Sequence, residues 1–368
     1  MTRQPFVDLG AQYREVRDEL LPEVERLLAA GAFVGGEPVT RFETAFAAYC
    51  GAPHAIGVAN GTDALHLALR ALGVAPGDDV VTVPNTFVAT AEAIVQAGAR
   101  PVLLDVRPDT LLMDVAALDA VATSRTRAIV PVHLYGCLAD VEGLERWCAA
   151  RGVALLEDAA QAHGAARGGR RAGAFGDAAA FSFYPAKNLG AAGEAGAVVT
   201  RRADVAQRVA RLRDHGQSAR YHHDLVGYNS RLDALQAAVL AVKLRRLDAW
   251  NARRRALAAL YRERLAKVPG VELTAAPADA ESHVYHLFVI RVAHRERLRA
   301  GLTARGIDTG LHYPVPIHLQ RGWQHLGYGP GDFPVAEAAA DAVLSLPIYP
   351  HMSENAVHRV CDAIEACG

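Results

Sequence analysis

The stretch Phe181-Ser182-Phe183-Tyr184-Pro185-Ala186-Lys187-Asn188 decides the fold, because it ends an apolar run in a lysine that packing does not require. Lysine is costly to bury, and a desolvated ammonium loses its proton more readily and becomes a usable amine nucleophile. Proline disfavours a helical conformation in the residue before it, so an extended turn directs Lys187 out of the predicted sheet. The stretch predicts a reactive amine at the end of a buried strand.

A matching acid lies 29 positions earlier (187 − 158), where the apolar run 153–156 ends in Glu157-Asp158. Two buried strands thus deliver an amine and a carboxylate. Pyridoxal phosphate (PLP) needs this pair: a lysine to hold its aldehyde, and an acid that keeps its ring nitrogen protonated so that the ring acts as an electron sink. We therefore predict PLP as the cofactor, with Lys187 and Asp158 as catalytic residues.

The order of apolar runs predicts an α/β protein with a mostly parallel sheet between helices. Such sheets hold their ligands at the carboxyl ends of the strands, where the polar residues from Thr62 to Lys187 fall. The predicted strands are 55–59, 80–83, 102–104, 128–132, 153–156, 178–183 and 195–200, and the predicted helices between them are 63–72, 88–97, 115–121 and 141–150.

A chain of 368 residues suggests two domains, because single cores stop growing at about 250–300 residues. We predict a large PLP-binding domain over residues 1–247 and a small α+β C-terminal domain over residues 248–368. The small domain has a strand-like run at 284–292 and helical patterns at 295–305 and 355–365.

Charge and cysteine usage exclude several classes of function. The 39 basic and 40 acidic residues give a net charge of −1, which offers no broad cationic surface to nucleic acid or anionic lipid. The five cysteines include no C-x-x-C pair, and the histidine-rich stretches lack the spacing of a zinc site. No signal core or run of roughly 18 apolar residues is present. We expect a cytoplasmic protein without a metal, nucleic-acid or membrane partner.

Several residues are candidates for holding the cofactor. Gly61, Thr62 and Asp63 open a helix after the first strand, where N–H groups and a hydroxyl can seat a phosphate or simply cap the helix. Ser182 and Asn188 flank the lysine and are further candidates. Other candidates are Phe87, which can stack on a planar ring or fill the core, and Gln161 and His163, which can hydrogen-bond a ring hydroxyl or only local backbone.

Two polar clusters are candidates for substrate recognition, together with Tyr184 beside the lysine. One cluster contains Arg220, Tyr221, His222 and Arg231, and the other contains Tyr313 and His318. The run Arg253-Arg254-Arg255 is most simply a solvated helix face.

Four segments in this order resemble the DegT/StrS group of nucleotide-sugar aminotransferases, which are PLP enzymes of the aspartate aminotransferase fold, fold type I. They are Asn60-Gly61-Thr62-Asp63-Ala64-Leu65, Glu157-Asp158-Ala159-Ala160-Gln161-Ala162-His163-Gly164, Phe181 to Asn188, and Gly227-Tyr228-Asn229-Ser230-Arg231-Leu232-Asp233. The resemblance runs from Phe6 to the closing helical pattern.

The resemblance implies a role for each matching residue. Lys187 forms the Schiff base and shuttles the proton, and Asp158 pairs with the pyridine nitrogen. Phe87 stacks on the ring, Gln161 lies near the ring hydroxyl, and Thr62 and Ser182 hold the phosphate. Asn229 reaches the cofactor phosphate of a neighbouring subunit, which implies a homodimer with shared active sites.

The implied reaction takes an amino group from L-glutamate and gives it to a nucleotide-linked keto-sugar. The stretches 220–224 and 251–255 are most similar to the branch that aminates dTDP-linked 3-keto-6-deoxyhexoses for antibiotics or surface sugars, and a 4-keto sugar is a rival. A cyclitol ketone is another possible acceptor. A catalytically silent sensor with the same fold is the alternative from a different class of function.

Overall fold

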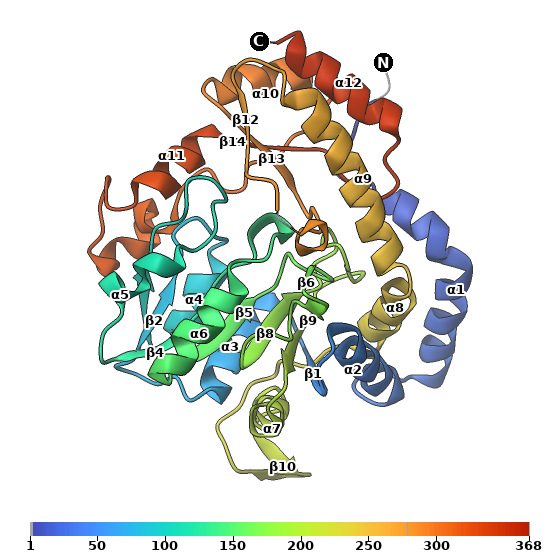
Figure 1. Cartoon of the computed structure of the whole chain (residues 1–368). Helices are drawn as coiled ribbons and strands as arrows, with labels where there is room; N and C mark the ends of the chain where they lie inside the picture. The colour runs from blue at the N-terminus through green and yellow to red at the C-terminus, as the bar shows by residue number, and fades with distance from the viewer. Residues whose placement is uncertain (1–2, 278, 368) are drawn as a thin grey trace.

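The computed structural model describes residues 3–277 and 279–367, in which a seven-stranded sheet lies between two layers of helices and a three-stranded sheet stands above it (Figure 1). Runs rich in valine and alanine form the large sheet, because they fit a pleated surface covered on both faces. Its strands are β1 (His54–Val58), β2 (Asp79–Thr82), β3 (Arg100–Leu103), β4 (Thr126–Ile129), β5 (Ala154–Asp158), β8 (Ala178–Ser182) and β9 (Gly196–Thr200). Each overlaps a predicted strand.

The large sheet has the order β1-β9-β8-β5-β4-β2-β3. β9 is antiparallel to both of its neighbours, and the other pairs are parallel. The prediction of an α/β fold with a mostly parallel sheet is therefore confirmed. β5 and β8 lie side by side, so their carboxyl ends bring Asp158 and the turn after Ser182 to one edge.

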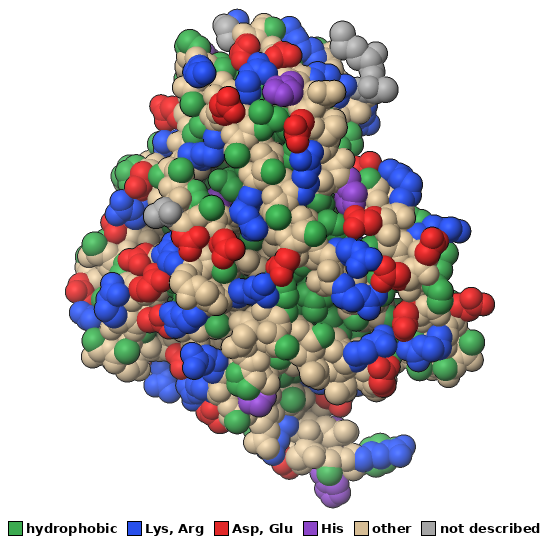
Figure 2. Space-filling view, turned by 45° about the vertical axis from the view of Figure 1, so that its right-hand side comes forward, with side chains coloured by type: hydrophobic (Ala, Val, Ile, Leu, Met, Phe, Trp, Pro, Cys, Tyr) green, Lys and Arg blue, Asp and Glu red, His purple; other side chains and the backbone are tan. Residues whose placement is uncertain are grey.

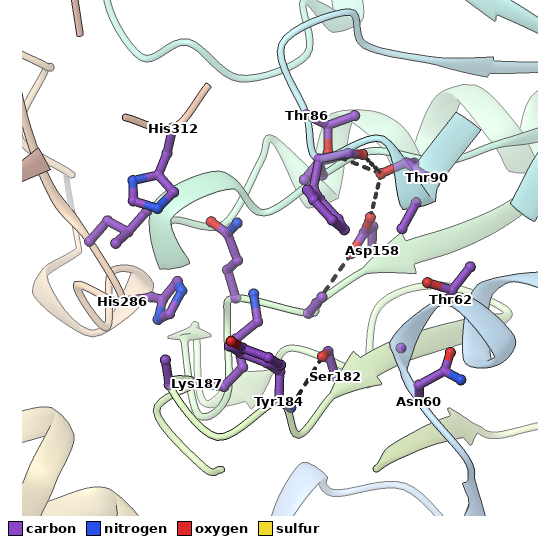
Figure 3. Close-up of a pocket in the computed structure, with 18 of the residues that line it drawn as sticks. Asn60, Thr62, Thr86, Thr90, Asp158, Ser182, Tyr184, Lys187, His286 and His312 are labelled. Atoms are coloured by element: carbon purple, nitrogen blue, oxygen red, sulfur yellow. Dashed lines mark hydrogen bonds between the residues drawn. The ribbon is translucent and has the colours of Figure 1, made fainter. Parts of the chain in front are cut away.

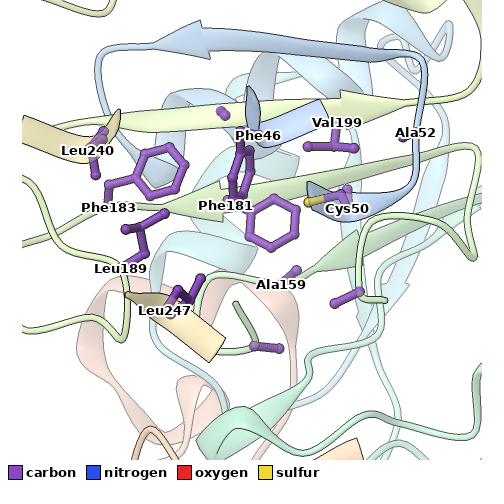
Figure 4. Close-up of a cluster of buried hydrophobic side chains, with 14 of the residues drawn as sticks. Phe46, Cys50, Ala52, Ala159, Phe181, Phe183, Leu189, Val199, Leu240 and Leu247 are labelled. Atoms are coloured by element: carbon purple, nitrogen blue, oxygen red, sulfur yellow. The ribbon is translucent and has the colours of Figure 1, made fainter. Parts of the chain in front are cut away.

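Alternate side chains of β8 enter two different cores, as expected for a sheet covered on both faces. Ala178 and Ala180 pack under one layer of helices, whereas Ala179 and Phe181 pack under the other. In the second core, the rings of Phe181 and Phe183 meet Phe46 edge-on at 5.0 and 5.1 Å (Figure 4). The first layer is α3 (Gly61–Ala71), α4 (Ala89–Gln96) and α7 (Ala203–Leu212), and the second is α2 (Glu37–Cys50), α6 (Val141–Arg151) and α8 (Ala234–Leu244).

A second, antiparallel sheet forms beside the first. It contains β12 (Val271–Leu273), β13 (Phe288–Val292) and β14 (Val343–Leu346), and its helices are α9 (Leu247–Leu265), α10 (Arg295–Ala304) and α12 (Glu354–Glu365). The start of the chain joins this part, since Gln4 pairs with Ile307 and donates to the Tyr349 hydroxyl at 2.8 Å. α9 begins at the predicted boundary, and the division at residue 247 stays a prediction.

Some elements differ from the sequence-based expectation. The predicted strand 284–292 forms only from Phe288, because Tyr285 has a φ of +45° and interrupts the extended backbone. The predicted helix 115–121 is a 3₁₀ turn followed by a single helical turn. The elements not yet given are α1 (Leu9–Ala30), α5 (Leu118–Val121), α11 (Pro334–Ala342), β6 (Ala166–Arg167), β7 (Arg170–Arg171), β10 (Gln217–Ala219), β11 (His222–His223) and the 3₁₀ segments Val115–Ala117, Leu134–Gly136, Ala280–Ser282, Ile317–Leu319 and Arg321–Leu326.

Within the described ranges, no helix is both long enough and apolar enough to cross a membrane.

Candidate active site

A cavity of about 740 Å³ lies where residues that follow several strands of the large sheet meet residues of α9 and of the segments next to the second sheet. In Figure 3, Lys187 lies between Asn60 and Thr62 on one side of the cavity and His286 and His312 on the other. The predicted site residues that line it are Gly61, Thr62, Asp63, Phe87, Asp158, Gln161, Ser182, Tyr184, Lys187 and Tyr313.

Lys187 is presented by a tight turn after β8. Its backbone N–H donates to the Tyr184 carbonyl at 2.8 Å. A Cβ on Gly190 would lie 2.2 Å from the Pro185 carbonyl oxygen, so only glycine allows the chain to return this closely. Burial lowers the pKa of Lys187 to about 8, although the charge of Asp158 opposes this shift. The amine is therefore available as a base or nucleophile near neutral pH.

Asp158 lies at the end of β5 and is 5% exposed. Burial raises the pKa of Asp158, and the hydrogen bond from Thr90 is the largest of the effects that oppose this rise. Thr90 donates to Oδ2 at 2.8 Å, and the Ala160 N–H donates to Oδ1 at 3.2 Å. The carboxylate is thus held in one orientation in a cavity that it shares with Lys187. A cationic ring nitrogen is the partner that such a buried carboxylate lacks.

The start of α3 forms a cradle for an anion. The Asn60 side chain accepts from the Asp63 N–H at 2.8 Å, whereas Gly61 and Thr62 keep N–H groups without intrahelical partners. A Cβ on Gly61 would lie 2.6 Å from the Cβ of Ser182, so glycine lets the helix end approach the end of β8. The N–H groups and the hydroxyls of Thr62 and Ser182 thus fit a phosphate.

The wall between the cradle and the amine is aromatic and polar. Phe87 is 54% exposed, unusual for a phenylalanine, and its ring centroid is 5.7 Å from that of Tyr313. Gln161 accepts from the Tyr135 N–H at 2.6 Å and donates to the Tyr313 hydroxyl at 3.1 Å. PLP fits this cavity, which combines the exposed ring of Phe87, the oriented amide of Gln161, the buried acid, the amine and the anion cradle.

The histidines of the cavity are neutral at neutral pH. Burial lowers the pKa of His312 to about 4 and the pKa of His286 well below its usual value. Lys187 and Arg254 are the only lysine and arginine among the described residues of the cavity wall. Arg254 is 4% exposed, so the prediction of a solvated face was wrong for this residue. It lies on the side of α9 that carries Tyr261 into the core.

Three of the candidate residues named from the sequence, Asn188, His163 and His318, lie outside the cavity. The Asn188 amide donates to Asn251 Oδ1 at 2.8 Å and to the Val284 carbonyl at 3.0 Å, which ties the lysine turn to α9. His163 lies beside Phe181 and Phe183 in the core on the opposite face of the sheet. His318 is buried with its Nε2 3.0 Å from Glu337.

The remaining candidates, on the hairpin of β10 and β11 or in the segment after it, are not part of the cavity wall of their own chain. β10 and β11 project from the body of the protein, and basic and histidine side chains gather on this projection (Figures 1 and 2). Arg220, Tyr221 and His222 are exposed there, and Asn229 is exposed nearby. Arg231 forms an ion pair with Asp214 at 2.7 Å.

Sequence reasoning missed several residues of the cavity wall, among them Thr90, Arg254 and His286. Of these three, only Arg254 had a local signal. It lies 3, 4, 7 and 11 positions before buried apolar residues of α9, a spacing that places it on their side of the helix. No cluster of three or more metal-ligating side chains is found in the described part of the chain.

Comparison with known proteins shows what the chain is similar to. Residues 14–365 match the family described as DegT/DnrJ/EryC1/StrS aminotransferases. The chain is 47% identical over 362 residues to the dTDP-3-amino-3,4,6-trideoxy-alpha-D-glucose transaminase of Streptomyces venezuelae (98% of this chain, 95% of the relative). It is also 47% identical to the erythromycin biosynthesis sensory transduction protein EryC1 of Saccharopolyspora erythraea (98% of this chain, 99% of the relative). The crystal structure of S. venezuelae DesV in complex with a ketimine intermediate superimposes with a TM-score of 0.96 at 47% identity, covering 100% of this chain and 98% of that one.

Proposed function

The chain belongs to the DegT/DnrJ/EryC1/StrS aminotransferase family, and from this we propose that it transfers the amino group of L-glutamate to a dTDP-linked 3-keto-deoxysugar. It is a PLP-dependent aminotransferase, as are its structural neighbours. The observation that carries the proposal is the meeting of Lys187 and Asp158 in a cavity that has an anion cradle at one end.

Bound PLP supplies an electron sink for the carbanion left when the donor loses its α-proton. Lys187 is the base that takes this proton, because its lowered pKa leaves part of the amine neutral near pH 8. The carboxylate of Asp158 would pair with the ring nitrogen and keep it protonated, and Thr90 holds the carboxylate in place. The same groups act in reverse order when the keto-sugar takes up the amine.

The name of the Streptomyces venezuelae relative supports both dTDP and carbon 3, because that protein is called a 3-amino-sugar transaminase. A 4-keto sugar and a cyclitol ketone are the competing acceptors. The name of EryC1 refers to sensory transduction, which favours the silent sensor as a second candidate. Lys187 and Asp158 in one cavity favour catalysis over this alternative.

We also propose a homodimer with shared sites. Asn229 and the exposed hairpin residues Arg220 to His222 do not reach the cavity of their own chain. Lys187 and Arg254 are the only lysine and arginine of the described cavity wall, and Arg254 lies away from the cradle, so a second subunit is a suitable source of further phosphate contacts.

One set of measurements tests this function. The purified protein should be yellow with PLP, L-glutamate should bleach the colour, and Lys187→Ala should lose both the colour and turnover. The bleached enzyme is then offered dTDP-linked 3-keto and 4-keto deoxysugars and an inosose, and mass spectrometry and NMR identify the aminated product. A colourless protein, or bleaching without transfer to any ketone, would contradict the proposal and favour the sensor.

A further inference from the structure

Arg254 is a buried guanidinium whose hydrogen bonds are all made by one of its three nitrogens. Nη1 donates to the carbonyls of Tyr285 at 3.0 Å, Ile348 at 2.9 Å and His286 at 3.4 Å. Nε is buried without a hydrogen-bond partner. All the hydrogen bonds that Arg254 makes with described residues come from Nη1, so Nη2 has none. Three carbonyls thus fix the orientation of the group and leave its Nε–Nη2 edge unused.

Within residues 3–277 and 279–367, no carboxylate forms an ion pair with Arg254. Burial alone accounts for its lowered pKa, about 9, and no acidic side chain opposes the shift. At neutral pH the group is still protonated, so the cavity wall contains an unpaired buried cation. Such a charge is costly unless an anion compensates for it. The neighbouring histidines, His286 and His312, are neutral and do not serve as that anion.

Arg254 and the phosphate cradle lie on different sides of the cavity. It contacts the His286 carbonyl, and His286 lies across Lys187 from Thr62 and Asn60 (Figure 3). An anion at Arg254 therefore lies beyond the reactive amine, on the side of the second sheet. Nε is closed off from solvent, so an anion in the cavity reaches Arg254 through Nη2, with a charge-assisted hydrogen bond.

We propose that Arg254 binds a carboxylate of the amino donor in the first half of the reaction. This inference deepens the proposed function and rests on it, since it assigns the donor its own site. The keto-sugar carries its negative charge on the diphosphate and has no carboxylate to place there, so Arg254 distinguishes the two substrates.

The test uses the PLP-loaded enzyme and two probes. L-Glutamate gives the rate of bleaching as a function of concentration, and glutarate, which has both carboxylates but no amine, gives an equilibrium affinity by calorimetry. We expect Arg254→Gln to weaken both on the order of 10- to 100-fold, the value of a charge-assisted hydrogen bond. Arg254→Lys should recover part of the loss because it keeps the charge.

Arg253→Gln is the matched control. It removes the same charge one residue away, but Arg253 faces the surface, where it pairs with Glu354 at 2.9 Å. This variant should leave both readouts unchanged. An unchanged glutarate affinity in Arg254→Gln would contradict the proposal. So would an equal slowing of bleaching and of sugar amination, because either result would mean that Arg254 only holds the backbone carbonyls of Tyr285, His286 and Ile348 in place.

Wild-type enzyme provides a test that does not depend on the variant folding. L-Glutamine and L-isoglutamine each replace one carboxylate of glutamate with a neutral amide, and one of them should bleach the enzyme on the order of 10- to 100-fold less effectively. Equal rates for all three compounds would overturn the inference. A wild type that binds glutarate through Arg254 but aminates no sugar would instead refute the proposed acceptor and keep the anion site.

Discussion

Thr90 donates its hydroxyl hydrogen to Asp158 Oδ2 across 2.8 Å, although the two residues are 68 positions apart. Thr86 lies 2.9 Å from the same hydroxyl, so a short chain of oxygens leads to the buried carboxylate. Asp158 thus depends on α4 for its orientation as well as on its own strand.

Thr90→Val should slow transamination about 10-fold, because the carboxylate loses one hydrogen bond and some of its orientation. The bond also opposes the rise in the pKa of Asp158, so its loss favours the protonated acid, which holds the ring proton less well. Steady-state kinetics with glutamate measure the effect. Thr90→Ser keeps the hydroxyl and should recover the rate, and the exposed Thr44→Val should have no effect. Equal loss in the serine variant would point to packing instead.

PLP capture by the apo-protein should accelerate as pH rises through about 8, because only the neutral form of Lys187 attacks an aldehyde. A free lysine amine, with its pKa near 10.4, should accelerate only at higher pH. Stopped-flow measurement of colour development gives both profiles. Asp158→Asn removes the charge that raises the pKa of Lys187, so its inflection should move to lower pH. An inflection that stays in place would show that the two groups are not coupled.

Borohydride reduction of the PLP adduct should mark one residue. The chain has only three lysines, Lys187, Lys243 and Lys267. Lys243 is buried and donates to the Gly190 carbonyl at 2.7 Å, and neither it nor Lys267 lines the cavity. Peptide mass spectrometry should find the label on Lys187 alone, and a label on Lys243 would mean that the wrong amine had been identified.

Glu157 points away from Asp158 and should matter for stability and not for chemistry. It accepts from the N–H groups of Gly173, Phe175 and Gly176 at 3.0 Å and lies 3.1 Å from His133 Nε2. Glu157→Gln places an amide N–H₂ against these donors and should cost roughly 1–3 kcal/mol of unfolding free energy. Urea unfolding measures this cost. Glu142→Gln, in a surface ion pair, should cost less than about 1 kcal/mol.

Mixing two inactive variants tests the shared site. In a mixed dimer of Lys187→Ala with Asn229→Ala, one site lacks both residues and the other has both. Random exchange of subunits should therefore restore PLP affinity to about a quarter of the sites in a two-fold dimer. PLP titration before and after mixing measures this fraction. No recovery in proven mixed dimers would show that Asn229 serves its own chain or no cofactor.

The sequence was most informative where chemistry follows a buried strand. Asp158 and Lys187 could be paired because each ends an apolar run, and neighbouring parallel strands end at one edge. Thr90 could not be found this way, since its contact depends on how α4 packs. The prediction for Arg254 was wrong because a run of three arginines indicates an exposed helix face. The helical spacing, which places the middle arginine on the buried side of α9, was not considered. α1 and α2 were not predicted, although Asp8 caps the first and glycines end both.

The pairing of Gln4 with Ile307 and Tyr349 has a mechanical consequence. A unit joined to its neighbour by one linker can swing and twist in many directions. Here the chain enters the three-stranded sheet region once at its beginning and again through α9, so two covalent tethers limit relative movement mainly to rotation about the line between them. Residues of both parts line the cavity, so such a hinge would bring Arg254 and Lys187 together along a single path.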